Sequence, residues 1–252
     1  MTAAGATAYV LTHTGARRAG NEDAVAVDDW ICANDISRPK VRRLESGTPH
    51  AVFVADGMGG HPGGDVASDT AVRYAARHAH GVADAAAGAD LLTDVNRKLY
   101  SAMVNGEGPP GMGTTLAGAV LHPDTVILVN VGDSKIYRVA PEHGLVQLSV
   151  DDTPGPKLAD GRTAAQTTAV LSQTLGGQIH ETPVTPHADA ETPVSGTRYL
   201  LCTDGLTDLV GPERLAALLA EKDDAEAVDA MFEAAMAEGG RDNITVALIR
   251  LA

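Results

Sequence analysis

Three apolar stretches separated by very short turns constrain the fold of this 252-residue chain more than any other feature. Residues 116–121, 125–131 and 135–139 have the pattern of strands, and His122-Pro-Asp124 and Gly132-Asp-Ser134 have the composition of turns. Such short connections can join only antiparallel strands, because a parallel pair needs a crossover of about a dozen residues or more. The sequence therefore excludes a doubly wound parallel sheet here and predicts an antiparallel one.

Apolar periodicity places the other elements. It predicts strands at 25–27, 30–33, 51–55, 198–202 and 244–251, and helices at 65–80, about 84–103, 213–221 and 224–238. Residues 34–49 are polar and are predicted to form a loop. We see no internal repeat and no linker, so residues 1–252 are predicted to form a single domain. Within it, residues 151–168 contain Pro154-Gly-Pro156 and few large apolar residues, which predicts a short flap that leaves the core.

Composition and charge exclude several classes of protein. Hydrophobic residues make up 44% of the chain, enough for a packed core, and the net charge of −14 with no basic stripe argues against a nucleic-acid partner. Cys32 and Cys202 are far apart in apolar surroundings and are predicted to be buried reduced thiols. The start of the chain does not resemble a signal peptide, and no apolar run is long enough to span a membrane. These observations predict a cytoplasmic protein without a membrane partner.

Four aspartates lie next to predicted buried strands, each in a tight turn. They are Asp56, Asp133, Asp204 and Asp242. Taken singly, each is explained by the high frequency of Asp-Gly and Gly-Asp in turns. Taken together, they place carboxylates on rigid strand ends, and carboxylates without His or Cys suit hard cations such as Mg²⁺ or Mn²⁺.

Near the N-terminus, Arg18 precedes the acidic pair Glu22-Asp23. An exposed charged loop explains this spacing, and so does a guanidinium beside a metal site, where its planar fork would grip two phosphate oxygens. Other motif searches fail. Gly57-Met-Gly59 begins like a dinucleotide loop, but Pro62 occupies the third glycine position, and neither a Walker lysine nor a Gly-x-Ser-x-Gly elbow is present.

Seven motifs occur in an order that is typical of one family. They are Arg18-Ala-Gly-Asn-Glu-Asp23, Val54-Ala-Asp-Gly-Met-Gly-Gly-His61, Gly111-Met-Gly-Thr-Thr115, Val131-Gly-Asp-Ser-Lys-Ile-Tyr137, Leu171-Ser-Gln-Thr-Leu-Gly176, Thr203-Asp-Gly205 and Gly240-Arg-Asp-Asn-Ile-Thr-Val246. In these motifs the chain resembles the bacterial metal-dependent protein phosphatases of type 2C, the PPM family.

The resemblance implies an α+β fold, a four-layer αββα sandwich in which two antiparallel sheets face each other between helices. The antiparallel strands predicted above agree with it. It implies hydrolysis of phosphoserine and phosphothreonine on proteins by a water activated at two or three Mn²⁺ or Mg²⁺ ions. The expected partners are phosphorylated substrates of Ser/Thr kinases, and the expected state is a monomer.

The resemblance also assigns metal ligands. Asp56 is expected to bridge two metals, with the carbonyl of Gly57 on one of them, and Asp204 and Asp242 are expected to complete the other. Asp133 matches a position that holds a third metal, shared with Asp204.

The remaining roles belong to the N-terminal motif and to one asparagine. Glu22 is expected to act on the second metal through water, with Asp23 and Asn243 in support. Arg18 is expected to bind the substrate phosphate, and with Asp56, Asp204 and Asp242 it forms the expected catalytic set.

Three departures from the family pattern stand out. Met58 occupies the position of a histidine that eukaryotic members use as general acid, and His61 lies three residues further on, so the acid is unassigned. Lys135 stands where arginine is usual, a modest change if it only packs or pairs on the surface. The flap after Asp151-Asp-Thr153 is shorter and richer in Pro and Gly than usual.

Two other classes of function stay open on the sequence. One is a pseudophosphatase that only binds a phosphoprotein, although such a scaffold needs none of the intact aspartates. The other is a calcium-stabilised structural protein, although the chain has no EF-hand loop and Arg18 would then have no purpose.

Overall fold

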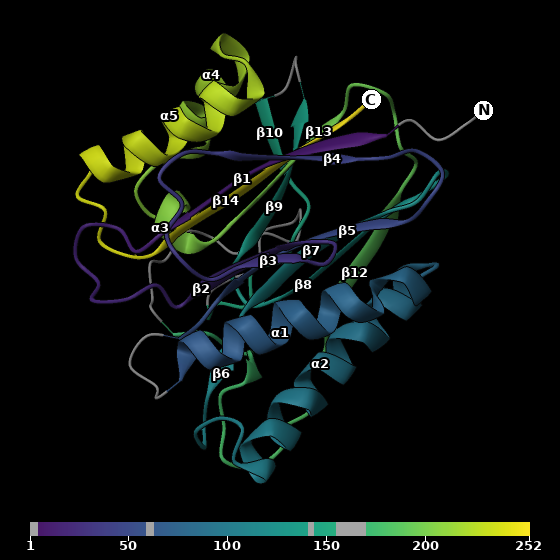
Figure 1. The fold of residues 1–252 in the computed structure, drawn as a ribbon, viewed down its shortest axis with the longest axis vertical. Helices are drawn as coiled ribbons and strands as arrows, with labels where there is room; N and C mark the ends of the chain where they lie inside the picture. The colour runs from purple at the N-terminus through teal and green to yellow at the C-terminus, as the bar shows by residue number, and fades with distance from the viewer. Residues whose placement is uncertain (1–4, 59–62, 141–143, 155–169) are drawn as a thin grey trace.

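Two antiparallel sheets lie face to face, and a pair of helices covers the outer face of each (Figure 1). This computed structural model describes residues 5–58, 63–140, 144–154 and 170–252. The arrangement confirms the predicted four-layer αββα sandwich. Every described strand pairing is antiparallel. Of the three strands from which the prediction began, Leu116–Leu121 and Val126–Val131 pair as predicted. The third, Lys135–Ala140, lies in the other sheet, so the predicted pairing across the turn at 132–134 is wrong and this turn crosses between the two sheets.

Each large sheet has six described strands. The first has the order β10 (Gly144–Gln147), β9 (Lys135–Ala140), β13 (Arg198–Cys202), β14 (Ile244–Leu251), β1 (Ala6–His13) and β4 (Lys40–Leu44). The second has the order β12 (His187–Glu191), β8 (Val126–Val131), β7 (Leu116–Leu121), β5 (His50–Asp56), β2 (Asp23–Val27) and β3 (Trp30–Cys32). A separate pair joins β11 (Leu175–Gly176) to β6 (Gly113–Thr114).

The helices divide between the two outer faces. Helices α1 (Gly64–His78) and α2 (Ala85–Asn105) pack on the second sheet, with the short 3-10 helix η1 (Ala79–Gly81) between them in sequence. Helices α4 (Pro212–Glu221) and α5 (Asp224–Ala237) pack on the first sheet, next to the single turn α3 (Asp204–Thr207). The three resulting interfaces each hold a buried apolar cluster, and small residues such as Ala117 and Ala119 let the two sheets approach closely.

The loop predicted at 34–49 is wrong in part, because it contains β4. This strand is rich in charge and mostly exposed, and it pairs with β1 at the sheet edge. Charged residues on an edge strand protect the sheet from pairing with another chain. Such a strand lacks the alternation of apolar and polar residues by which strands are predicted from sequence. Strands β1 and β12 were likewise not predicted.

The described part of the predicted flap is attached to the sheets. Asp152 is buried, and Asp151 binds Lys135 at the start of β9, whereas the sequence placed both aspartates in an excursion from the core. Residues 155–168 of the flap lie outside the described residues.

Two smaller expectations are settled by the fold. Both cysteines are free thiols, but only Cys202 is buried, whereas Cys32 is partly exposed. Within the described ranges, none of the helices combines the length and the apolar character needed to cross a bilayer.

One buried carboxylate joins α5 to the first sheet. Asp224 accepts hydrogen bonds from Arg250 of β14 (Nη2 to Oδ1, 2.7 Å) and from Arg198 of β13 (Nη1 to Oδ1, 3.2 Å). Burial acts to raise the pKa of Asp224, but the hydrogen bonds and charges of the two arginines outweigh it and lower the pKa below its usual value.

We expect Asp224→Asn to reduce the free energy of unfolding by about 2 kcal/mol, less than a fully buried pair would lose because Arg250 stays partly in water. Because the folded-state pKa is depressed, this stabilisation is present above about pH 4 and is lost as the pH falls through the folded pKa. Urea unfolding at pH 7 and at pH 3 measures both effects.

Asp223→Asn, which keeps a good N-cap for α5, is the matched control and should change the free energy of unfolding by less than about 0.5 kcal/mol. Equal losses in the two variants would contradict the role of the ion pairs.

Candidate metal centre

The predicted acidic residues come from both sheets and meet at one end of the sandwich. Asp56 is the last residue of β5, and Asp23, the first residue of β2, lies opposite it in the β-ladder. Asp204 lies two residues after β13, at the start of α3, and Asp242 lies two residues before β14, which pairs with β13. Asp133 lies in the turn between β8 and β9. The strands thus bring together carboxylates from positions as far apart as 23 and 242, as the sequence predicted.

Asp56 and Asp204 lie close enough for their side chains to share a hydrogen bond. Burial raises the pKa of Asp56 well above its usual value, and the neighbouring charges of Asp23 and Asp204 raise it further. Burial also raises the pKa of Asp204, although the hydrogen bond from Asp56 opposes this. The ionised form of Asp56 is therefore costly unless positive charge is nearby.

Asp133 belongs to the same electrostatic group. Burial, followed by the charge of Asp204, raises the pKa of Asp133 to about 7, while Lys135 opposes the rise. The Lys135 ammonium is mostly buried and donates to Asp151 Oδ2 at 2.7 Å and to the Asp133 carbonyl at 3.3 Å. Lys135 is therefore not a surface residue but an internal cation beside the acidic group, a more consequential position than surface packing or pairing.

Asp23 is completely buried behind Asp56. Its Oδ2 accepts hydrogen bonds from Thr203 Oγ1 (2.8 Å) and Thr245 Oγ1 (2.7 Å), which lie at the facing ends of the other sheet. Burial raises the pKa of Asp23 to about 7, and the two threonine hydrogen bonds oppose the rise. Asp23 thereby links the two sheets immediately behind the candidate ligands.

Arg18 stands on the loop that approaches Asp242. Its Nη2 donates to Asp242 Oδ2 at 2.5 Å, and the charges of Asp242, Asp56 and Glu22 all act to raise the pKa of the guanidinium. The side chain is 43% exposed, so one face remains open to solvent. Arg18 therefore brings a fixed positive charge to the rim of the acidic group.

Asn243 fixes the shape of that loop. Its Oδ1 accepts the backbone N–H of Glu22 (2.8 Å), and its Nδ2 donates to the carbonyls of Thr14 (2.9 Å) and Gly20 (3.0 Å). The carbonyl of Glu22 in turn accepts the N–H of Gly57 at 3.0 Å. One side chain thus determines the path of the loop that carries Arg18 and Glu22.

The residues fit a hard divalent cation by their chemistry. All the candidate side chains offer oxygen, the atom that Mg²⁺ and Mn²⁺ prefer, and Asp204 Oδ1 is a buried oxygen without a hydrogen-bond partner among the described residues. Among the described residues, no three His, Cys, Asp or Glu side chains are grouped so that they could hold a metal ion as they stand. The carboxylates are neighbours around an acidic centre, and their mutual repulsion is relieved when cations lie between them.

Met58 does not offer an acid to this centre. Its N–H donates to the Gly113 carbonyl at 3.1 Å, and its side chain fills the space that a Cβ on Gly113 or Gly177 would need. A thioether has no proton to give, so Met58 packs the base of the site. His61 lies outside the described residues.

Sequence reasoning gave no role to the hydroxyls that hold Asp56. Thr115 Oγ1 accepts the N–H of Asp56 at 3.0 Å and lies 2.7 Å from Ser134 Oγ in the turn that carries Asp133. Both residues stand in motifs that the sequence reading noted, but the contact joins positions 19 residues apart and has no local pattern.

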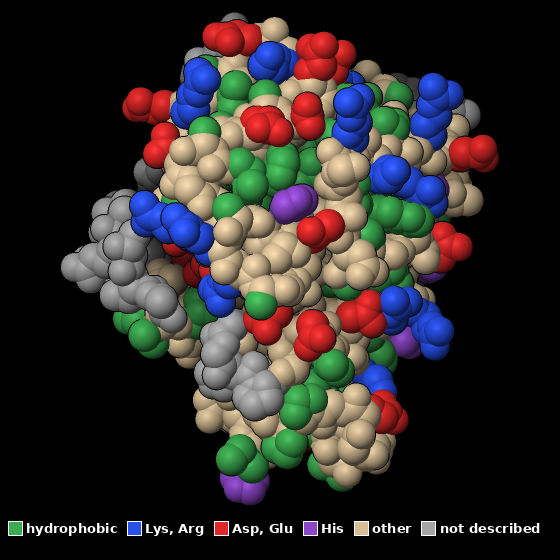
Figure 2. All heavy atoms as spheres, turned by 60° about the vertical axis from the view of Figure 1, so that its left-hand side comes forward, with side chains coloured by type: hydrophobic (Ala, Val, Ile, Leu, Met, Phe, Trp, Pro, Cys, Tyr) green, Lys and Arg blue, Asp and Glu red, His purple; other side chains and the backbone are tan. Residues whose placement is uncertain are grey.

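Figure 2 turns the side of the molecule at the left of Figure 1 toward the viewer. Basic and acidic side chains are interspersed over the described part of this face, with hydrophobic side chains scattered between them. On this face the charges form a mixed surface.

Comparison with known proteins places the chain in a family. A model described as protein phosphatase 2C matches residues 38–248. The Ser/Thr protein phosphatase PstP of Mycobacterium tuberculosis is 34% identical over 208 residues, which cover 77% of this chain but only 38% of PstP. The Ser/Thr phosphatase stp of Listeria monocytogenes is 32% identical over 216 residues, covering 79% of this chain and 83% of stp.

Solved structures agree with the sequence matches. A crystal structure of M. tuberculosis PstP superposes with a TM-score of 0.77 at 28% identity, covering 98% of this chain and 99% of that one. A structure of the PstP catalytic domain in complex with two manganese ions has the same TM-score, identity and coverage. The family model, the relatives above 30% identity and the shared sandwich together establish that this chain belongs to the protein phosphatase 2C family.

Proposed function

We propose that the chain hydrolyses phosphoserine and phosphothreonine on proteins at a Mn²⁺ or Mg²⁺ centre. The observation that carries the proposal is the meeting of Asp56, Asp133, Asp204 and Asp242 at one end of the sandwich, with the open guanidinium of Arg18 at its rim. The two manganese ions in the PstP structure support the choice of cation.

In this proposal Asp56, Asp204 and Asp242 hold two cations, with help from the Gly57 carbonyl and from Glu22. When bound, the cations lower the pKa of the attacking water and neutralise charge on the phosphate. Those five residues would hold the cations. Because a carboxylate binds a cation in its ionised form, cation binding would depend on pH.

Asp133, together with Asp204, is proposed to hold a third cation. Asp23 and Asn243 are proposed as supporting residues. Asp23 braces the ends of both sheets, and Asn243 braces the loop that carries Arg18 and Glu22.

Arg18 is proposed to bind the substrate phosphate. Its side chain presents a planar fork that matches two phosphate oxygens and stays charged at any physiological pH. In the structure the guanidinium already touches the acidic centre through Asp242 while keeping a solvent-exposed face. A phosphate approaching the cations would meet that face, so Arg18 orients the ester and neutralises charge in the transition state.

The same reasoning extends to partners and setting. We propose that the substrates are proteins phosphorylated by Ser/Thr kinases and that the chain acts as a single domain and as a monomer. A cytoplasmic location stays a prediction from the sequence.

Hydrolysis of para-nitrophenyl phosphate and of a phosphothreonine peptide, with Mn²⁺ and with EDTA, tests the proposal. We expect Mn²⁺ to raise kcat/KM at least about a hundredfold on both substrates, since metal Lewis-acid chemistry supplies several kcal/mol. A protein that binds the phosphopeptide but hydrolyses neither substrate would instead be a phosphoprotein-binding pseudophosphatase.

A further inference from the structure

One buried carboxylate next to the candidate metal centre has no part in the chemistry proposed above. Asp152 is only 5% exposed and lies in the segment between β10 and residue 155. A buried carboxylate is costly unless it is hydrogen-bonded or paired with a charge. The partners of Asp152 therefore indicate its role.

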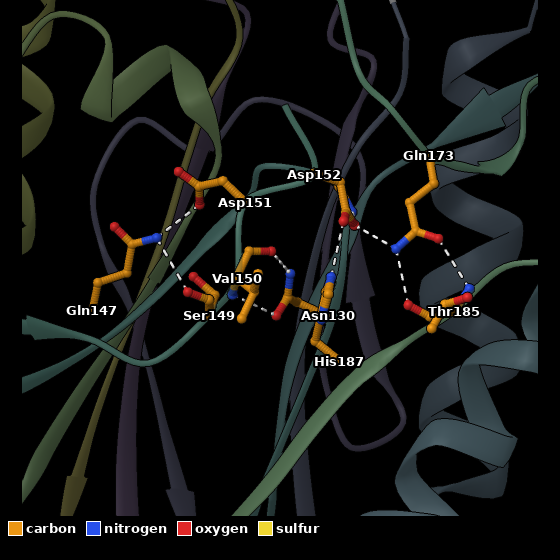
Figure 3. Close-up of polar contacts among 10 residues, drawn as sticks. Asn130, Gln147, Ser149, Val150, Asp151, Asp152, Gln173, Thr185 and His187 are labelled. Carbon is orange, nitrogen blue, oxygen red and sulfur yellow. Dashed lines mark hydrogen bonds and ion pairs between the residues drawn. The ribbon is translucent and has the colours of Figure 1, made fainter. Parts of the chain in front are cut away.

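Three donors from three different segments converge on this carboxylate (Figure 3). Oδ2 accepts from the backbone N–H of Gly132 at 2.9 Å and from Gln173 Nε2 at 2.8 Å. Oδ1 lies 2.9 Å from Nε2 of His187, a residue of β12. The carboxylate thus connects the β8–β9 turn, the segment before β11 and the edge strand of the second sheet.

The backbone of Asp152 binds two of the same three segments a second time. Its N–H donates to the Gly132 carbonyl at 3.0 Å, and its carbonyl accepts from the N–H of Ser172 at 2.7 Å. Asp152 therefore both accepts a hydrogen bond from Gly132 and donates one to it, and Gly132 directly precedes Asp133.

The other side of that turn is fixed by packing. Gly132 has a φ of 99°, which favours glycine, and a Cβ there would come within 2.6 Å of Thr115 Cγ2. Thr115 also contacts Ser134, the residue after Asp133, and accepts the N–H of Asp56. Asp133 therefore stands in a turn held between Asp56 on one side and Asp152 on the other.

Gln173 is itself held in one orientation. Its Nε2 donates to the Thr185 carbonyl at 2.9 Å and its Oε1 accepts the Thr185 N–H at 2.9 Å, as Figure 3 shows. The amide can therefore present only its donor side to Asp152. A donor aimed in this way acts as a fixed anchor for the carboxylate.

We propose that Asp152 is a positioning residue: by clamping Gly132 it fixes the direction in which Asp133 presents its carboxylate to a metal ion. The inference rests on the proposed function, because Asp133 needs aiming only if it binds a cation. Residues that orient ligands from outside typically change metal affinity 10–100-fold when they are lost. A merely structural Asp152 would lower the stability of the protein and leave metal affinity unchanged.

Three variants test this in the full chain, with Asp133→Asn as the reference for loss of the proposed ligand itself. Asp152→Ala removes every side-chain contact. Asp152→Asn can still accept from Gly132 and Gln173 through its amide oxygen, while its NH₂ group faces Nε2 of His187. Asp28→Ala is the matched control, because Asp28 likewise accepts a backbone N–H (Ala51, 2.8 Å) and pairs with a histidine (His50, 2.8 Å), but at the far end of β2.

Calorimetric titration with Mn²⁺ alone at pH 8 is the first measurement. We expect Asp152→Ala to weaken the same Mn²⁺ binding event that Asp133→Asn weakens, by about tenfold or more. Asp152→Asn should restore the affinity to within about threefold of wild type. Asp28→Ala should lower the melting temperature and leave Mn²⁺ binding unchanged.

Hydrogen exchange of the Gly132 amide in metal-free protein is the second measurement, and it does not depend on the proposed function. Exchange should accelerate about tenfold in Asp152→Ala and not in Asp28→Ala.

Two results in Asp152→Ala would overturn the inference. One is an unchanged exchange rate of the Gly132 amide. The other is an unchanged Mn²⁺ affinity when Asp133→Asn has lost affinity. Loss of Mn²⁺ affinity in Asp28→Ala as well would also overturn the inference, because it would show that any destabilised variant binds Mn²⁺ more weakly. If Asp133→Asn binds Mn²⁺ as wild type does, the metal role of Asp133 fails and the aiming of a ligand fails with it. Wild type that binds no Mn²⁺ would sink the proposed function itself.

Discussion

Asp56→Asn should lower kcat/KM at least about a hundredfold in Mn²⁺, on both para-nitrophenyl phosphate and a phosphothreonine peptide. The substitution keeps the shape of the side chain and removes the charge proposed to lie between two cations. Loss of a residue that only orients a ligand typically costs 10–100-fold, so loss of a proposed direct ligand should cost more.

The fold should survive this change. Asp56 ends β5, where its backbone is held by Thr115 and by pairing with β2. Burial and neighbouring carboxylates raise the pKa of Asp56, so its ionised form is unfavourable in the folded protein without metal. A neutral asparagine removes that cost, and metal-free Asp56→Asn should therefore melt no lower than wild type at pH 8.

Steady-state kinetics and thermal melting measure the two effects separately. Asp29→Asn, at an exposed aspartate in the turn after β2, is the control and should be normal in both assays. Wild-type phosphopeptide hydrolysis by Asp56→Asn would end the two-metal proposal, whereas a collapse of the melting temperature would mean that Asp56 supports the fold.

Arg18→Ala should reduce kcat/KM by about 10–100-fold, the cost of hydrogen bonds to a charged group. We expect most of the loss in KM, because the proposed role is to bind phosphate. A fall in kcat as well would mean that the contact tightens in the transition state. Steady-state kinetics on the phosphothreonine peptide separates these outcomes.

Metal binding gives an independent view of the same residue. The guanidinium and a cation both compete for Asp242, so removing Arg18 should not weaken Mn²⁺ binding. Arg17→Ala, at the exposed neighbouring arginine, is the matched control and should behave as wild type. Normal kinetics with weakened Mn²⁺ affinity in Arg18→Ala would instead make Arg18 a residue that organises the metal ligands.

The sequence by itself determined the antiparallel character of the fold and the aspartates at its strand ends. Strands such as β5, β7 and β8 are continuous buried apolar runs, and their burial leaves a direct mark on composition. The short turn between β7 and β8 admits only an antiparallel pair, so that pairing could be inferred before any contact was known. The layers themselves were implied by the family resemblance, and the turn between β8 and β9, which is also short, crosses from one sheet to the other. The aspartates were visible because each interrupts such a run.

The tertiary structure alone decided what depends on partners distant in sequence. The charged strand β4 exists because β1 offers it a free edge, a condition that its own five residues do not record. Lys135 could be interpreted from sequence as a surface substitution, yet the fold places its ammonium between Asp151 and the turn of Asp133. The contacts of Asp152 join positions 20 to 35 residues apart. Hydrogen bonds between side chains on different elements have no periodicity along the chain, so only packing of the two sheets reveals which polar groups meet.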